Sequence, residues 1–111
     1  MVLLVRADLG MGRGKIAAQA AHAAVTAALS TLGSPAFDAW VRDGQPKVVC
    51  RVESAEELHA VVERALGSGV AAGIVHDAGR TQVEPGTPTC GWVGPERAER
   101  IDVITGDLRL L

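Results

Sequence analysis

The stretch GMGRGK at residues 10–15, which continues as IAAQAAHA at residues 16–23, decides the fold of this chain. An apolar run at residues 2–5 comes just before it, so the order predicts a buried strand, a glycine-rich turn and a helix that begins near Arg13. The three alternating glycines leave backbone N–H groups uncovered, and two cations lie beside them at a helix N-terminus. The turn therefore favours an anion.

One face of the predicted helix is polar. Lys15, Gln19, His22 and Thr26 are spaced four, three and four residues apart, which places their side chains on the same side of a helix.

The turn matches neither of the common nucleotide-binding fingerprints. Leu9 stands where a P-loop has its first glycine, and Ile16 stands where the P-loop hydroxyl belongs. Lys15 occupies the position of the third glycine of a dinucleotide-binding turn. A tight strand-to-helix turn with a solvated cationic face is the simpler interpretation of this segment alone.

Length and composition predict one soluble domain over residues 1–111 with an aliphatic core. Hydrophobic residues make up 48% of the chain, yet it has one Phe, two Trp and no Tyr. No apolar run reaches the ~20 residues that cross a bilayer, and Arg6 and Asp8 interrupt the first apolar stretch, unlike a signal peptide. We therefore expect a cytoplasmic protein without a membrane partner.

The charges are unevenly distributed although the net charge is only −2. Residues 1–52 hold six Lys or Arg against three Asp or Glu, and residues 53–111 hold five against ten. Because exposed charges are screened beyond about 10 Å, a local basic patch can bind phosphate on an acidic protein. A generic solvated surface is the alternative explanation.

The two cysteines do not suggest a disulfide or a metal site. Cys50 and Cys90 each lie in a strand-like run, form no C-x-x-C pair and have no histidine at metal-ligand spacing. We interpret them as small buried hydrophobic residues, and we expect no metal ion and no cofactor.

Hydrophobic patterns and turn residues predict four strands that alternate with helices. The strands are expected at residues 2–7, 47–52, 71–76 and 89–93, and the helices at residues 13–31, at residues 36–42, after a capping box at residues 54–57, and from Pro95 onward. The second helix is expected to bury Phe37, Trp40 and Val41, and the last helix to bury Ile101, Val103 and Ile104. The short apolar tail at residues 108–111 is expected to pack.

This alternation predicts an α/β domain of three layers, α/β/α, with a largely parallel sheet. About twelve residues without an evident helix join the third and fourth strands, which makes an antiparallel fourth strand plausible. Asp77 leaves the end of the third strand, and the turn at residues 8–14 leaves the end of the first, so both polar clusters are expected at one edge of the sheet. The alternative is that Asp77 caps the loop, while Thr81, Thr87 and Thr89 bind loop backbone.

Several motifs together resemble the class II peptidyl-tRNA hydrolases, the archaeal and eukaryotic type. They are RADLGMGRGKIAAQ at residues 6–19, GQPKVV at 44–49, DAGRTQV at 77–83 and PGTPT at 85–89, and the similarity spans essentially the whole chain. The resemblance implies a four-stranded mixed sheet in the order 2-1-4-3, with strand 4 antiparallel and helices on both faces. It also implies a homodimer.

The implied reaction is hydrolysis of the ester that joins a peptide to the 3′-terminal ribose of tRNA. The resemblance assigns catalysis to Lys15, Asp77, Thr81 and Thr89. We expect Asp77 to orient or deprotonate a water and the threonines to supply hydroxyls. Because a neighbouring lysine weakens an aspartate as a base, Lys15 is also a candidate to hold the oxyanion or a phosphate. His22 is the rival base, since histidine titrates near neutrality.

The tRNA itself is expected to contact Arg13, Gln19, Lys47 and Arg80. Contacts to the phosphate backbone carry no sequence information, which suits an enzyme that accepts every tRNA. Two other hypotheses remain open at this point: a non-catalytic RNA-binding or adaptor module on the same scaffold, and a binder of small phosphate-containing molecules.

Overall fold

The computed structural model describes residues 1–79 and 83–111, so the predictions for Arg80 and Thr81 lie outside the described residues. The described residues form four strands and four helices. In order they are β1 (Val2–Arg6), α1 (Arg13–Thr31), α2 (Pro35–Arg42), β2 (Val48–Val52), α3 (Ala55–Gly67), β3 (Ala72–His76), β4 (Pro88–Val93) and α4 (Ala98–Thr105).

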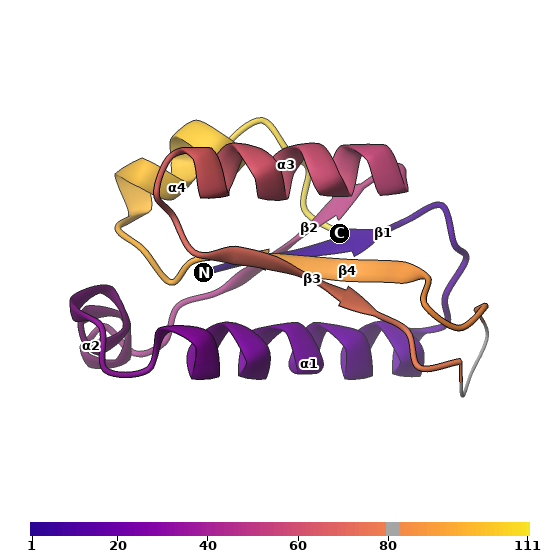
Figure 1. Ribbon diagram of the computed structural model, residues 1–111, viewed down its shortest axis with the longest axis horizontal. Helices are drawn as coiled ribbons and strands as arrows, with labels where there is room; N and C mark the ends of the chain where they lie inside the picture. The colour runs from indigo at the N-terminus through magenta and orange to yellow at the C-terminus, as the bar shows by residue number, and fades with distance from the viewer. Residues whose placement is uncertain (80–82) are drawn as a thin grey trace.

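The four strands form one mixed sheet in the order β2-β1-β4-β3. β1 runs parallel to β2, and β4 runs antiparallel to both β1 and β3. Figure 1 shows α1 along one face of the sheet and α3 and α4 along the other. The three-layer α/β/α architecture, the strand order and the antiparallel fourth strand are confirmed. The prediction of a largely parallel sheet, made from the alternation of strands and helices, is wrong, because only the β1–β2 pair is parallel.

Serine caps fix where two of the helices begin. Ser34 Oγ accepts a hydrogen bond from Phe37 N at 3.1 Å, and Ser54 Oγ accepts one from Glu57 N at 3.0 Å. Glu57 also reaches back and accepts from Glu53 N at 2.6 Å, one residue before the position that a capping box predicts. These bonds satisfy amides that the first helical turn leaves without an acceptor.

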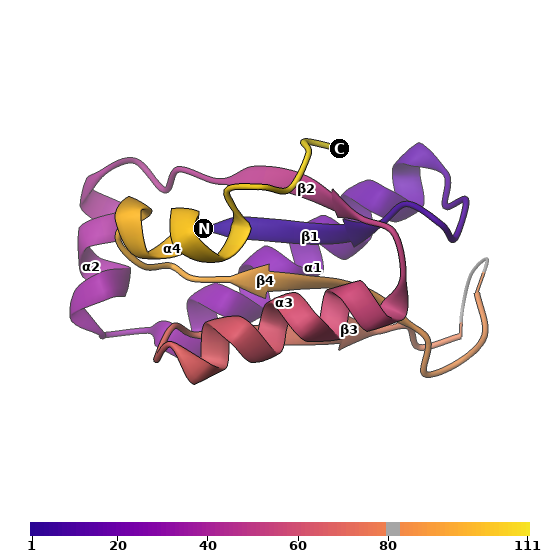
Figure 2. The same cartoon turned by 90° about the horizontal axis from the view of Figure 1, so that it is seen from above.

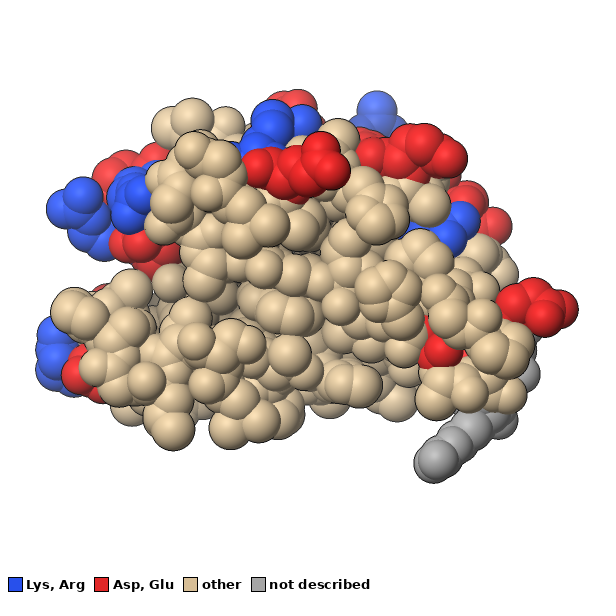
Figure 3. Space-filling model, viewed as in Figure 1, with Lys and Arg blue, Asp and Glu red and all other residues tan. Residues whose placement is uncertain are grey.

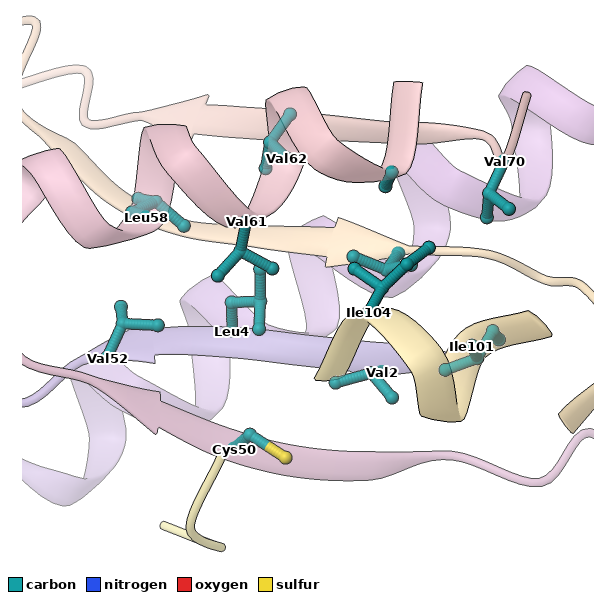
Figure 4. Close-up of a cluster of buried hydrophobic side chains, with 12 residues drawn as sticks. Val2, Leu4, Cys50, Val52, Leu58, Val61, Val62, Val70, Ile101 and Ile104 are labelled. Carbon is teal, nitrogen blue, oxygen red and sulfur yellow. The ribbon is translucent and has the colours of Figure 1, made fainter. Parts of the chain in front are cut away.

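Each face of the sheet carries its own aliphatic core, because alternate residues of a strand point to opposite faces. Leu4 and Val52 pack under α3 against Leu58 and Val61, as Figure 4 shows. Leu3 and Val5 point to the opposite face and pack with the residues of α1. Cys50 belongs to the first cluster and Cys90 to the second, and both are buried free thiols, as predicted.

Three details of the helices differ from prediction. Val103 is 87% exposed, and Val41 is 40% exposed. α4 begins at Ala98 and not at Pro95, so it has only two turns, and its buried Ile101 and Ile104 are three residues apart. Val103 follows Ile101 by two positions, about 200° around the helix, and so it points to solvent.

The C-terminal tail adds backbone hydrogen bonds to the free edge of β2. Arg51 N donates to Arg109 O at 2.9 Å, and Leu111 N donates to Val49 O at 3.0 Å. Leu108 packs against the core under α3, although Leu110 and Leu111 stay largely exposed. The expected packing of the tail is thus confirmed for its backbone. None of the described helices is long and apolar enough to cross a membrane.

Candidate active site

Two loops meet at one end of the sheet. The glycine-rich loop leaves the end of β1, and the loop between β3 and β4 extends from the same end, as Figures 1 and 2 both show. Arg6 joins them: its guanidinium donates to Pro88 O at 3.0 Å and pairs with Asp8 at 2.7 Å. The hydrogen bond between the Arg6 and Asp8 side chains raises the pKa of Arg6 and lowers the pKa of Asp8.

An ion pair between Lys15 and Asp77 lies where the loops meet. Lys15 Nζ, in the first turn of α1, contacts Asp77 Oδ1, directly after β3, across 62 positions of sequence. The two side chains are only 6% and 3% exposed. The expectation that the cationic and carboxylate segments share one edge of the sheet is therefore met.

Asp77 also organises its own loop. Its second carboxylate oxygen, Oδ2, accepts from Gly79 N at 2.7 Å. Its backbone N–H donates to Thr87 O at 2.8 Å, and its carbonyl accepts from Gly86 N at 2.8 Å. The capping role that was the alternative for Asp77 thus coexists with its pairing to Lys15, and the loop holds the carboxylate in a fixed orientation.

Gln19 and Thr89 form a second contact, one helical turn further along α1. Thr89 is fully buried, and its hydroxyl donates to Gln19 Oε1 at 2.6 Å. Cys90 Sγ donates to the main-chain oxygen of Gln19 at 3.2 Å. Sequence reasoning missed this pairing. The sequence signals only that Gln19 lies on the same helix face as Lys15, four residues later. It does not identify Thr89 as the partner, because that depends on the direction of β4.

The remaining predicted site residues lie around this centre or away from it. Arg13 is exposed at the start of α1, two residues before Lys15. His22 is exposed, and seven residues of helix place it about 10 Å from Lys15 along the axis. Lys47 precedes β2, so it lies at the opposite end of the sheet, where it donates to Gln45 O at 2.8 Å.

The N-terminus of α1 faces the same edge of the sheet as the ion pair. The N-cap residue, Gly12, has no side chain that could cap this helix, and the first turn of the helix holds no acidic residue, so the positive end of the helix dipole lies at this edge. Within residues 1–79 and 83–111, no group of three His, Cys, Asp or Glu side chains could hold a metal ion. The arrangement can bind an anionic group and can polarise a water at Asp77.

Comparison with known proteins identifies the family. The sequence profile of the peptidyl-tRNA hydrolase PTH2 family matches residues 1–111. The chain belongs to the PTH2 family. A peptidyl-tRNA hydrolase of Metallosphaera sedula is 50% identical, with 100% of this chain and 98% of the relative covered. Those of Sulfolobus acidocaldarius and Methanocaldococcus jannaschii are 49% and 48% identical, again with 100% of this chain and 98% of each relative covered.

Of the two cysteines of this PTH2 chain, Cys90 lies nearer the Lys15–Asp77 ion pair, and its burial makes it a poor nucleophile. Burial raises its pKa to about 11, against smaller opposing effects of the Thr89 hydroxyl and the Lys15 charge. Thiolates, and not thiols, attack electrophiles. An acyl-enzyme on Cys90 is therefore disfavoured at neutral pH.

We predict that neither cysteine of the folded protein reacts with a thiol-specific disulfide reagent at pH 8, whereas the denatured chain titrates two thiols. Because the folded pKa of Cys90 is raised, its contribution to stability is present below about pH 9 and is lost as the pH rises through about 11. A Cys90→Ala variant should lack this loss. Rapid labelling of one thiol in the native protein would contradict the prediction.

Proposed function

We propose that this protein hydrolyses the ester between a peptide and the 3′-terminal ribose of tRNA by direct attack of water. Membership of the PTH2 family supports the reaction class. The observation that carries the proposal is the buried Lys15–Asp77 pair at the edge of the sheet where the two polar loops meet. An ester needs little more than an oriented water and donors for the oxyanion.

In this proposal Asp77 handles the water. Gly79 N–H donates to Oδ2 of Asp77 and Lys15 Nζ pairs with Oδ1, and these bonds hold the carboxylate in the orientation in which it would take a proton from water. The rival base, His22, lies too far along α1 to share that water. We therefore assign the base to Asp77, with Thr81 as a further contributor of a hydroxyl, as the family resemblance implies.

Lys15 pairs with Asp77 and brings positive charge to the site. Its ammonium has three donors, of which the bond to Asp77 uses one. The remaining donors and the positive end of the α1 dipole can hold the phosphate next to the terminal ribose. This role agrees with the alternative drawn from the sequence, in which Lys15 holds the oxyanion or a phosphate.

Contacts to the tRNA backbone are proposed for Arg13 beside the centre, for Arg80, and for Lys47 at the far end of the sheet. Figure 3 shows one face of the molecule, on which charges of both signs gather over α3 and α4, while the surface of α1 is almost uncharged. That face presents no continuous basic surface. We therefore propose that the acylated 3′ end of the tRNA enters at the end that carries the glycine-rich loop, while Lys47 contacts a more distant part of the tRNA backbone.

We further propose that residues 1–111 act as one cytoplasmic domain and that two copies form a homodimer. Support for the homodimer comes from Val25, Leu29 and Leu32, which are 58%, 68% and 68% exposed at helical spacing on α1 and beyond its end. No charged residue lies between Lys15 and Asp38. Exposed apolar stripes of this kind are typical of protein interfaces. Sedimentation of the purified chain tests this assembly.

The test of the proposed function is release of peptide from an N-blocked aminoacyl-tRNA by the purified chain, without added metal. We expect multiple turnovers, and we expect the same chain to bind deacylated tRNA with an affinity that falls as salt rises. Binding of tRNA without cleavage would favour the adaptor alternative. Stabilisation by free nucleotides without any affinity for tRNA would favour the small-molecule alternative.

A further inference from the structure

The burial of Thr89 is at odds with a direct contact to substrate. Its side chain has no exposed surface, and its hydroxyl is engaged at 2.6 Å by Gln19 Oε1. The other neighbours of that hydroxyl are more distant, with Val75 O at 3.5 Å and Cys90 Sγ at 3.9 Å. The group that Thr89 can influence is therefore Gln19.

The Thr89 bond sets the orientation of the Gln19 amide. An amide oxygen can only accept, so the hydroxyl proton belongs to this bond, and the amide nitrogen must point away from Thr89. The Cys90 thiol holds the main chain of the same residue at 3.2 Å. Two consecutive residues of β4 thus fix both the backbone and the side chain of Gln19.

The nitrogen of that amide carries two donors next to the ion pair. Within the described part of the chain, no hydrogen bond joins Gln19 Nε2 to another group. Gln19 is half-buried, and it lies one turn from Lys15, a spacing that brings Cβ atoms within about 5–6 Å. A neutral, oriented donor with no competing partner is what a developing oxyanion requires.

We propose that Gln19 donates an Nε2–H hydrogen bond to the oxyanion of the tetrahedral intermediate, and that Thr89 is its positioning residue. This inference rests on the proposed hydrolysis. Water adds to the ester carbonyl carbon, its proton passes to Asp77, and the carbonyl electron pair moves to the oxygen that Gln19 binds. On collapse the bond to the ribose oxygen breaks, and that oxygen takes the proton from Asp77.

The first test is Gln19→Glu, which keeps the shape and the acceptor for Thr89 but removes both donors. We expect kcat to fall by about 10²- to 10³-fold, as for loss of one oxyanion donor, with KM changed less than about threefold. Gln45→Glu is the matched control, because it makes the same charge change at the far end of the sheet. It should keep the wild-type kcat.

The second test asks whether Thr89 acts through Gln19. Thr89→Val removes the hydroxyl at nearly constant shape, and we expect a loss in kcat of about tenfold, rescued by Thr89→Ser. In a double-mutant cycle, Thr89→Val should cost nothing further once Gln19→Met is present. Denaturation curves of each variant show whether it is folded.

Three results would overturn this inference while leaving the hydrolase proposal intact. They are a Gln19→Glu variant with wild-type kcat, a rise in KM alone, or losses in the Gln19→Met and Thr89→Val variants that multiply in the double variant. Failure of the wild-type chain to release peptide would instead refute the proposed function itself.

Discussion

Replacing Asp77 by asparagine is expected to lower kcat for peptide release by about 10²- to 10⁴-fold, the usual contribution of a general base. Asparagine keeps the size of the side chain and can still accept from Gly79 N–H, which holds Asp77 Oδ2 at 2.7 Å. It cannot take a proton from water. Single-turnover release from an N-blocked aminoacyl-tRNA measures the chemical step directly.

The control for this variant is Asp102→Asn, which makes the same change on the exposed side of α4 and should leave kcat unaltered. Binding of deacylated tRNA should survive in Asp77→Asn, because the proposed backbone contacts lie on other residues. If Asp77→Asn retained more than about a third of the wild-type kcat, the carboxylate would not be the base.

Removing the cation of the ion pair should lower the unfolding free energy of the protein. Lys15→Met leaves Asp77 buried, with its side chain 3% exposed, without the Lys15 ammonium. Losing one member of a buried pair typically costs about 3–5 kcal/mol of unfolding free energy. Urea denaturation followed by far-ultraviolet circular dichroism measures the change.

The double variant Lys15→Met/Asp77→Asn separates stability from catalysis. With no charge left to bury, most of the lost unfolding free energy should return, while peptide release should stay at or below the level of Asp77→Asn. Lys47→Met serves as the control, because that lysine is exposed and its contact with the Trp40 ring, 5.6 Å from the ring centroid, contributes only about 0.5–1 kcal/mol. A double variant no more stable than Lys15→Met would refute the electrostatic explanation.

Local patterns were sufficient to predict most of the fold. The apolar run of β1, the glycine-rich turn and the alanine-rich helix predicted the bounds of α1 to the residue, Arg13–Thr31. The long loop without a helix correctly pointed to an antiparallel β4. The strand order came from the resemblance to the family, because pairing between distant strands leaves no local signal.

The features that sequence reasoning missed depend on the direction and register of the strands and on the rotation of the helices about their axes. Lys47 was predicted to contact tRNA, and its distance from the ion pair was not evident from the sequence, because only the parallel pairing of Val2 with Val48 puts the start of β2 at the other end of the sheet. Val103 was expected inside, but a two-turn helix buries only one narrow stripe. The Gln19–Thr89 bond joins residues 70 positions apart, and it requires the register of β4 against α1.

The uneven placement of aromatic residues has a spectroscopic consequence. Trp40 and Trp92, the two indoles of a chain without tyrosine, both belong to the cluster on the α1 side of the sheet. The cluster beneath α3 and α4 contains neither. Intrinsic fluorescence therefore monitors one half of the molecule alone, and a shift in emission that precedes the loss of ellipticity would reveal that the layer bearing Lys15 loosens before the other.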